Sequence, residues 1–331
     1  MVMAAGVGSR LDPLTQNVPK PLVPILNKPV MDILLDKLEA CGIEAVIANT
    51  HYLAEMIQDR YTSRNLNKLR FHSIYESNLS GTAGGVKKCE FFFSEEENFL
   101  VLSADGLHDV DLKSVVDSHI KSGCIATMAI VEVQHSEVSK YGVVVPSADN
   151  IVLEFQEKPS LAEAKSNYIN TGIYVFSKKI FDFIPANTVY DFAKDVFPSL
   201  MKAQKPINVC KIDWYWSDIG TLEQYIQSNW DALNNDVDAN VINKVCTDNS
   251  KYVIGNNCSI SDDINILNNV IIGNNCKIGK NVSLDNVILW DNVELKDNTV
   301  VKGSVIANDS IIDGCIQDEI IPAGYKQEIL V

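Results

Sequence analysis

Short apolar runs alternate with helical patterns from the start of the chain to about residue 235. The apolar runs predict buried strands over Val2–Ala4, Ala45–Asn49, Phe71–Tyr75, Phe99–Ser103 and Ala126–Val131. Apolar residues at helical spacing predict helices over Val30–Cys41, Leu112–Ser122 and Leu222–Leu233. Strands that alternate with helices form mostly parallel sheets covered on both faces, and such sheets bind ligands beyond the carboxyl ends of their strands. We therefore predict an α/β fold with its chemistry in the loops that follow the strands.

After about residue 240 the spacing of the aliphatic residues changes to six positions. The first members of this series are Ile254, Ile260, Ile266, Ile272, Ile278 and Leu284. Turn-forming Gly, Asn and Asp fill the gaps, so the pattern is the hexapeptide signature of a parallel β-helix and resembles the left-handed type. Two five-residue steps, which lead to Leu289 and Ile306, are expected to deform the coil locally. The alternative, a β-sandwich with many Asn turns, would alternate with period two instead.

The change of period divides the chain into an α/β domain over residues 1–237 and a β-helix over residues 238–331. A length of 331 residues exceeds what a single core usually supports, which agrees with two domains. Because a solenoid buries its faces by stacking and must cap its ends, we expect assembly into a homo-oligomer.

The charge of the chain limits its partners. Lys and Arg number 28 against 43 Asp and Glu, which gives a formal net charge of −15. Such a surface repels nucleic acid and anionic membranes, so we expect neither as a partner. No apolar run is long enough to span a bilayer, and the start of the chain lacks the basic head and cleavage site of a signal peptide. The eight cysteines form no Cys-x-x-Cys pair, so they suggest neither a disulfide framework nor a zinc knuckle. We therefore expect a cytoplasmic protein.

A glycine-rich loop follows the first predicted strand, in the segment Ala4-Ala5-Gly6-Val7-Gly8-Ser9-Arg10-Leu11. Its two glycines let backbone amides approach a phosphate closely, and Arg10 adds a fixed cation. The spacing does not match a Walker loop, and the third glycine of a dinucleotide fingerprint is missing. Further along, Lys20 stands between two prolines, whose stiff backbone limits the entropy lost when its ammonium group is held against a phosphate.

Taken together, Ala-Ala-Gly-x-Gly-Ser-Arg-Leu-x-Pro-Leu-Thr and the following Pro-Lys-Pro-Leu-Val-Pro resemble the sugar-1-phosphate nucleotidyltransferase (nucleoside-diphosphate-sugar pyrophosphorylase) family. The resemblance covers more than twenty positions here and continues through later landmarks in the same order. It implies a Rossmann-like nucleotidyltransferase domain that couples a nucleoside triphosphate to a sugar 1-phosphate and releases pyrophosphate. The first strand of the family normally starts a residue or two earlier, so we expect the strand at Val2–Ala4 to be loosened.

The resemblance also implies a Mg²⁺ site. Leu100–Asp105 predicts a strand that ends in the family's metal-binding aspartate, although Ala104 stands where the family usually has glycine. Trp216-Ser217-Asp218-Ile219-Gly220 resembles the segment with the second aspartate, which should also end a strand. Mg²⁺ prefers carboxylate and phosphate oxygens and keeps several waters, so Asp105 and Asp218 would suffice.

Three segments resemble the family's sugar-binding elements. They are Tyr141-Gly142-Val143-Val144, Phe155-Gln156-Glu157-Lys158-Pro159 and Asn170-Thr171-Gly172-Ile173-Tyr174. Backbone at Gly142 would pass close to the ligand. The resemblance implies that Glu157 and Asn170 meet the sugar and that Lys158 pairs with the sugar phosphate.

The resemblance places the nucleotide between the first loop and Ser80-Gly81-Thr82-Ala83-Gly84-Gly85, whose glycines would open a helix and leave free amides beside the ligand. The expected nucleotide-binding residues are Ala4, Ala5, Gly6, Gly8, Ser9, Glu76, Gly81 and Thr82. If Glu76 faces the base, its carboxylate suits the two adjacent donors of guanine better than uracil or thymine. The segments also look most like mannose-1-phosphate guanylyltransferases, which favours GTP and mannose 1-phosphate. Capping of the helix or ribose binding are the other roles open to Glu76.

The mechanism implied is an in-line attack of the sugar phosphate on the α-phosphorus, in which the enzyme mainly positions groups and stabilises charge. Arg10, Lys20, Asp105 and Lys158 are the expected catalytic residues. A uridylyl- or thymidylyltransferase and a non-catalytic regulatory subunit remain alternatives. A regulatory subunit would be expected to have lost Arg10, Lys20, Asp105 or Asp218, and all four are present. A β-helix that transfers acyl groups is disfavoured, because His135 is the last histidine and acyltransferases of this type often use a histidine base.

Overall fold

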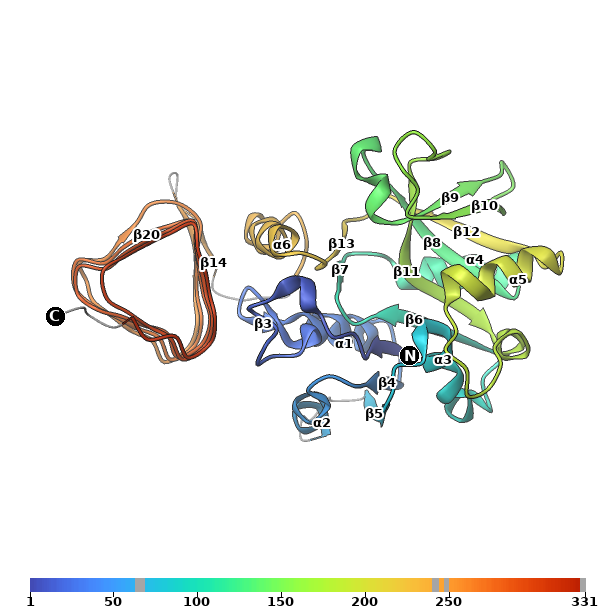
Figure 1. Ribbon diagram of the computed structural model, residues 1–331, viewed down its shortest axis with the longest axis horizontal. Coiled ribbons are helices and arrows are strands. Elements are labelled where there is room, and N and C mark those ends of the chain that lie inside the picture. Colours follow the sequence, from blue (N-terminus) through green and yellow to red (C-terminus); the bar gives the residue numbers. More distant parts are fainter. Residues whose placement is uncertain (63–68, 240–243, 247–249, 328–331) are drawn as a thin grey trace. The chain divides into compact units, whose positions relative to one another are not determined.

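The computed structural model describes residues 1–62, 69–239, 244–246 and 250–327 (Figure 1). Within them the chain forms two compact units. One comprises Met1–Gly6 and Leu34–Asp218, and the other comprises Val7–Ile33 and Ile219–Val331. This division by compactness differs from the boundary at residue 237 that the sequence predicts, and that boundary stays a prediction.

A nine-stranded mixed sheet organises the first unit. Its main path runs β10 (Val152–Glu157), β9 (Gly142–Pro146), β11 (Tyr168–Ser177), β6 (Asn98–Ser103), β1 (Val2–Ala4), β4 (Ala45–Thr50) and β5 (Arg70–Tyr75). Two further strands extend it beside β11: β8 (Ala126–Glu132) and β12 (Ile207–Ile212). The β6-β1-β4-β5 part is parallel, whereas β11 runs antiparallel to β6 and β8. The expected α/β fold is confirmed, with a sheet that is more mixed than the strand–helix alternation indicates.

Helices of the first unit pack on the sheet. The described residues contain the helices α1 (Val30–Ala40), α2 (Ala54–Thr62), α3 (Gly81–Lys88), α4 (Leu112–Ser122) and α5 (Phe197–Lys202), and α6 (Leu222–Asn234), which belongs to the second unit. In α4 the side chain of Asp111 accepts hydrogen bonds from two amides of the first turn, and Gly123 ends the helix with a φ of 64°. The helix packs on β8, β11 and β12, while α3 packs on β1. Between sheet and helices lies a core rich in aromatic residues, including Phe99, Phe176 and Phe192.

The second unit contains a parallel β-helix with three sheets, seen down its axis as a triangle in Figure 1. The first sheet holds β14 (Lys244–Cys246), β15 (Lys251–Ile254), β18 (Val270–Ile272), β21 (Val287–Leu289), β24 (Val305–Ile306) and β27 (Ile320–Ile321). The second holds β16 (Ser259–Ile260), β19 (Lys277–Ile278), β22 (Glu294–Leu295) and β25 (Ile311–Ile312). The third holds β17 (Asn265–Ile266), β20 (Ser283–Asp285), β23 (Val300–Lys302) and β26 (Cys315–Gln317). The inward aliphatic residues of the six-residue series form its core, which confirms the predicted β-helix.

The five-residue steps change the coil locally at one corner, as expected, and do not disrupt the strand ladder. Ile272 stays paired with Leu289, and Leu289 with Ile306. A coil with a five-residue step has one residue fewer at the corner between the third and first sheets. At this corner Asn286 and Gly303 adopt φ values of 55° and 58°. The corner is therefore one residue shorter in these coils, while the sheets keep their register.

Asparagine side chains stack along another corner of the β-helix. Asn257, Asn275, Asn292 and Asp309 each have a φ near 60°, a conformation that Asn and Asp tolerate better than most residues. The amide of Asn275 donates to the Asn292 side chain at 3.2 Å, and that of Asn292 donates to Asp309 at 2.9 Å. The asparagines therefore serve both the turn and the contact between coils.

Residues 7–33 and α6 pack with the β-helix in the second unit. The indole of Trp290, which is 2% exposed, donates to the hydroxyl of Tyr225 on α6 at 2.8 Å. The side chain of Asn27 donates to the carbonyl of Ile272 at 2.6 Å. These contacts explain why the compact units do not follow the predicted domain boundary.

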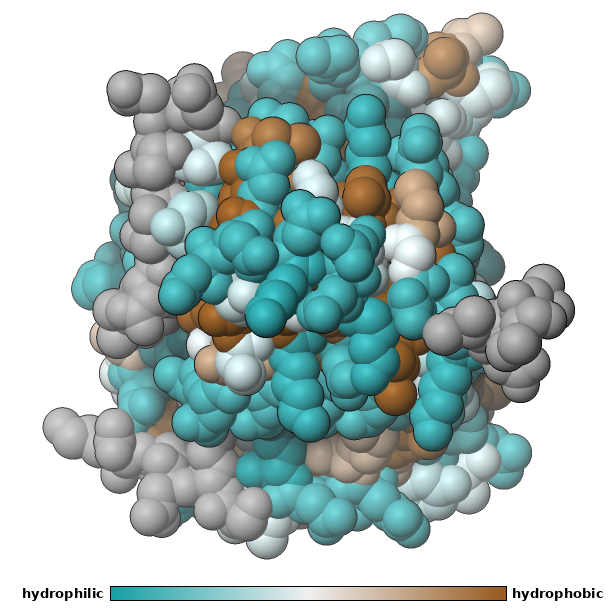
Figure 2. Space-filling model, turned by 90° about the vertical axis from the view of Figure 1, so that its left-hand side faces the viewer, coloured by the Kyte–Doolittle hydropathy of each residue, from teal (hydrophilic) through white to brown (hydrophobic). Residues whose placement is uncertain are grey.

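Figure 2 shows one face of the molecule, where hydrophilic side chains make up most of the surface and hydrophobic ones form narrow patches between them. In the described part of the chain, no helix is long and apolar enough to cross a membrane.

Candidate functional site

The parallel strands of the first unit bring several predicted residues to one edge of the sheet. Because β1, β4, β5 and β6 are parallel, the residues that follow them lie at the same edge. These residues include Ala5 after β1, Glu76 after β5 and Asp105 after β6. The structure therefore assembles part of the expected nucleotide and metal site.

Asp105 and Asp218 come together through a short ladder. Asp105 lies in the turn between β6, which ends at Ser103, and β7 (Gly106–His108). Strand β13 (Trp216–Asp218) pairs antiparallel with β7, and Asp218 is the direct partner of Gly106. Asp218 thus pairs with the residue that directly follows Asp105 in the chain, both aspartates are half-buried, and Asp218 ends a strand as expected.

The donor set fits Mg²⁺. Among the described residues no group of three or more His, Cys, Asp or Glu side chains could hold a metal ion by itself. Two carboxylates suit a Mg²⁺ that takes its other ligands from water and substrate phosphates. Ala104, which replaces the family's glycine, is buried and donates its N–H to the carbonyl of Met3, so the side chain is accommodated.

The predicted sugar-binding residues gather on β9, β10 and β11. Gly142 pairs with Glu157, and a Cβ on Gly142 would lie 2.6 Å from the Phe155 ring and 3.2 Å from a Glu157 carboxylate oxygen. Glycine is therefore required for the side chains of β10 to lie over β9. Lys158 follows with a φ of 46° and donates its N–H to the carbonyl of Tyr141 at 3.1 Å.

Asn170 lies at an irregularity of β11. The pairing of β11 with β8 shifts between Asn170 and Tyr174, and Gly172 has a φ of 75°. The Asn170 side chain accepts from the N–H of Gly172 at 3.1 Å and donates to the Tyr174 hydroxyl at 2.7 Å. The bulge thus fixes the orientation of the asparagine.

Glu76 is buried and engaged within the protein. One carboxylate oxygen accepts from Asn49 at 2.6 Å, and the other accepts from Ser80 and, at 2.8 Å, from Lys88. Burial favours the neutral acid, but hydrogen bonds from Lys88, Ser80 and Asn49 outweigh it and lower the pKa of Glu76. Asn49 in turn accepts from the N–H of Ala4 at 3.2 Å, so the carboxylate links β5, β4 and β1 to α3.

The start of α3 corrects our expectation of free amides. The N–H groups of Ala83 and Gly84 both donate to the carbonyl of Tyr190 at 3.0 Å. A Cβ on Gly81 would lie 2.5 Å from that carbonyl oxygen. The hydroxyl of Thr82 donates to Asp191 at 2.8 Å. The glycines therefore permit close packing of the helix start against Tyr190, and these two amides are not available to a ligand.

The glycine-rich loop starts in the first unit, and its part from Val7 onward belongs with Lys20 to the second unit. Gly8 has a φ of 76°, and a Cβ there would lie 2.9 Å from the Cβ of Lys20, so the loop and the lysine are in close contact. The hydroxyl of Thr15 donates to the carbonyl of Gly8 at 3.0 Å. Lys20 is 9% exposed, whereas Ser9 and Arg10 are exposed. Sequence reasoning did not give Thr15 its role in holding the loop.

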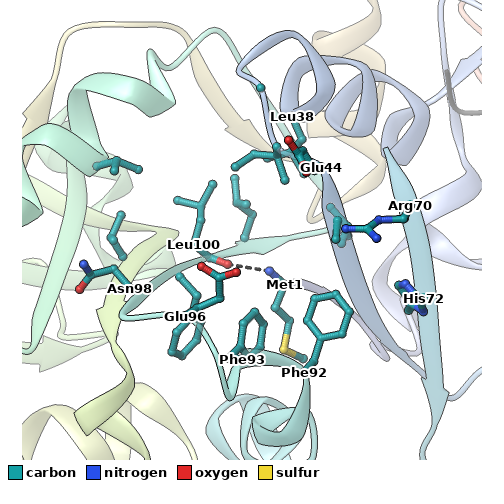
Figure 3. Close-up of a pocket in the computed structure, with 18 residues that line it drawn as sticks. Met1, Leu38, Glu44, Arg70, His72, Phe92, Phe93, Glu96, Asn98 and Leu100 are labelled. Carbon is teal, nitrogen blue, oxygen red and sulfur yellow. Dashed lines mark hydrogen bonds between the residues drawn. The ribbon is translucent and has the colours of Figure 1, made fainter. Parts of the chain in front are cut away.

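A pocket of about 580 Å³ lies at the amino ends of the parallel strands (Figure 3). Met1, Arg70, Glu96 and Asn98 are among its lining residues, and none of the predicted site residues lines it. The amino group of Met1 donates to the carbonyl of Leu100 at 2.6 Å, and burial lowers its pKa to about 5. The pocket lies at the edge of the sheet opposite the loops that carry Asp105 and Glu76.

Sequence reasoning also missed how the site residues are connected. The hydroxyl of Tyr141 donates to Asp218 at 3.1 Å, and the indole of Trp216 donates to the carbonyl of Thr171 at 3.1 Å. The signal for Tyr141 was its position directly before Gly142. No sequence pattern indicates the hydrogen bond, because Tyr141 and Asp218 are far apart in the chain.

Comparison with known proteins agrees with this geometry. The nucleotidyl transferase family model matches residues 1–235, and the model of the GMPPB C-terminal domain matches residues 249–319. A UTP–glucose-1-phosphate uridylyltransferase of Synechocystis is 38% identical over 72% of this chain and 64% of its own length. A mannose-1-phosphate guanylyltransferase catalytic subunit beta of Drosophila pseudoobscura is 33% identical over 68% of this chain and 60% of its own length. The matches thus span about three fifths of these relatives.

Solved structures resemble the chain as well. HddC from Yersinia pseudotuberculosis, complexed with GMP-PN, has a TM-score of 0.59 and 28% identity, and covers 69% of this chain and 96% of its own. A UDP-glucose pyrophosphorylase complexed with UDP-glucose has a TM-score of 0.60 and 25% identity, over 69% and 95% of the two chains. With a family model that spans residues 1–235 and with the aspartate pair and strand-end loops described above, the chain belongs to the nucleotidyl transferase family.

Proposed function

We propose that this protein is a sugar-1-phosphate nucleotidyltransferase that joins a nucleoside triphosphate to a sugar 1-phosphate and releases pyrophosphate. The observation that carries the proposal is the β7–β13 ladder, which brings Asp105 next to Asp218 at the carboxyl edge of the parallel strands. Both aspartates are hard oxygen donors at the edge where α/β sheets bind nucleotides.

The residues have distinct parts in the proposed in-line displacement. Lys158 holds the phosphate of the incoming sugar, and Glu157 and Asn170 orient the sugar hydroxyls. Arg10 and Lys20 neutralise charge on the triphosphate and on the departing pyrophosphate. When bound, Mg²⁺ would be held by Asp105 and Asp218 and would supply charge neutralisation at the phosphates. The attacking phosphate is already ionised, so no side chain has to remove a proton from it.

For the substrates we propose GTP and mannose 1-phosphate. The match to the GMPPB C-terminal domain and the similarity to mannose-1-phosphate guanylyltransferases support this choice. The carboxylate of Glu76 does not support this choice, because it already accepts hydrogen bonds from side chains of the protein. We therefore assign Glu76 the role of ordering the loop before α3 instead of recognising the base. The similarity to the uridylyltransferase of Synechocystis favours UTP and glucose 1-phosphate as the second candidate.

Pyrophosphate release with Mg²⁺ would test the proposal, with GTP, UTP, dTTP, CTP and ATP each offered with mannose, glucose and N-acetylglucosamine 1-phosphates. Turnover of one pair, lost in Asp105→Asn and kept in Asp117→Asn, is the expected result. Asp117 is a suitable control because it is exposed on α4 and pairs with Lys113. Binding of a nucleotide sugar without turnover of any pair would favour a regulatory subunit and contradict the proposal.

We also propose that the β-helix mediates assembly into a homo-oligomer, because a solenoid has two ends to cover. Light scattering after size-exclusion chromatography would measure the mass of the particle. A mass equal to one chain, 36.6 kDa, would contradict this proposal.

A further inference from the structure

Tyr141 contacts two of the predicted site residues through different groups. Its hydroxyl donates to a carboxylate oxygen of Asp218 at 3.1 Å. Its backbone carbonyl accepts from the N–H of Lys158 at 3.1 Å. A single residue therefore connects the predicted metal ligand with the predicted ligand of the sugar phosphate.

The ring of Tyr141 is held by packing. It meets the indole of Trp216 edge to face, with ring centroids 5.7 Å apart. Trp216 is two residues before Asp218 on β13 and is itself fixed by its hydrogen bond to Thr171. Both rings belong to a small apolar cluster with Val138, Val143 and Ile169. The packing thus fixes the ring of Tyr141 and holds its hydroxyl against Asp218.

A donor on one oxygen of a carboxylate restricts how that carboxylate can turn, and groups that orient a metal ligand in this way affect metal affinity. We propose that Tyr141 is a positioning residue that holds Asp218 in its metal-binding orientation and links it to Lys158. This inference rests on the proposed function, because it takes Asp218 as a metal ligand and Lys158 as a phosphate ligand. Tyr141 itself need not contact metal or substrate.

Tyr141→Phe removes the hydroxyl and keeps the ring that packs on Trp216. We expect the dissociation constant for Mn²⁺, measured by electron paramagnetic resonance with Mn²⁺ alone and with a nucleoside triphosphate, to rise by about ten- to a hundredfold. The Mg²⁺ concentration for half-maximal turnover should rise in parallel, while the KM for the nucleotide at saturating metal changes little. Tyr168→Phe is the matched control, since Tyr168 is also half-buried and its ring contacts Lys211.

A double-variant cycle separates positioning from general damage. In an Asp218→Ala background, Tyr141→Phe should have no further effect on Mn²⁺ binding. An unchanged Mn²⁺ affinity in Tyr141→Phe, within twofold of the unaltered protein, would overturn the inference even if the protein turns over a substrate pair. Weakened Mn²⁺ binding in a protein that turns over no pair would support the inference and refute the proposed activity. If the unaltered protein binds no Mn²⁺ under either condition, the metal site fails and the inference with it.

Discussion

His108 is buried on β7, beside the turn that carries Asp105. It is 3% exposed, and within the described residues its Nδ1 has no hydrogen-bond partner. Burial, with a smaller contribution from Lys37, lowers the pKa of His108 to about 4. The imidazole is therefore neutral in the folded protein at physiological pH.

This histidine should make the fold sensitive to mild acid. Between pH 6.5 and about 4 the unfolded chain binds a proton at His108 and the folded chain does not, so stability falls as the pH is lowered through this window. The contribution is of the order of 3 kcal/mol. Urea denaturation at a series of pH values should show a shallower loss of stability for His108→Leu than for the unaltered protein. An equal loss of stability with falling pH in both proteins would show that His108 is not the source of the acid sensitivity.

Glu76 changes stability in the same direction, because its pKa is also lower in the folded protein than in the unfolded chain. Its pKa is lowered in the folded protein, so the carboxylate stabilises the fold above its unfolded pKa, and this contribution is lost as the pH falls through the lowered folded value. Glu76→Gln should cost about 1–3 kcal/mol at pH 7, because a charge-assisted hydrogen bond and the contact with Lys88 are lost. The difference should shrink at acid pH, and the exposed Glu95→Gln is the control. A deficit that is the same at pH 7 and in acid would contradict this account.

At the level of elements, the asparagine stack decides how the coils of the β-helix turn. Asn275 combines a φ of 57° with side-chain hydrogen bonds to neighbouring coils. Asn275→Gly loses the hydrogen bonds but suits the conformation, whereas Asn275→Ala also adds the strain of a left-handed residue, about 1–2 kcal/mol. Chemical denaturation should therefore rank stability as Asn, then Gly, then Ala. If alanine is no worse than glycine, backbone strain is not what the asparagines relieve.

Patterns of sequence predict most elements but few of the contacts between them. Strands and helices such as β1 and α4 follow from local spacing, whereas the prediction that Asp218 ends a strand follows from the resemblance of its segment to the family. The engagement of Glu76 could not be predicted, because its partners come from two other segments. The sequence also could not predict that the carbonyl of Tyr190 accepts from the first amides of α3. A glycine indicates that another group approaches closely, but it does not indicate which group.

At the scale of the whole molecule, residues 7–33 and α6 form one compact unit with the β-helix. Trp290→Phe removes the donor to the buried Tyr225 hydroxyl, whose pKa is raised by burial. Loss of one buried hydrogen bond costs about 0.5–1.5 kcal/mol, so the melting temperature should fall. Trp214→Phe, at a tryptophan that is 53% exposed, should leave it nearly unchanged. Equal melting temperatures for the two variants would mean that the contact contributes little.

The shortened corners have a consequence for how this β-helix tolerates insertions and deletions. Neighbouring coils differ in length, as the spacing of stacked side chains changes from 18 residues between Asn256 and Asn274 to 17 between Asn274 and Asp291. The residue is lost at a corner where Asn286 and Gly303 turn the chain, while each strand keeps its inward face. A deletion within a strand would instead turn its inward residues to the solvent. Length variation among β-helices of this kind should therefore collect at corners, where one residue more or less changes the outline of a coil and leaves its core unaltered.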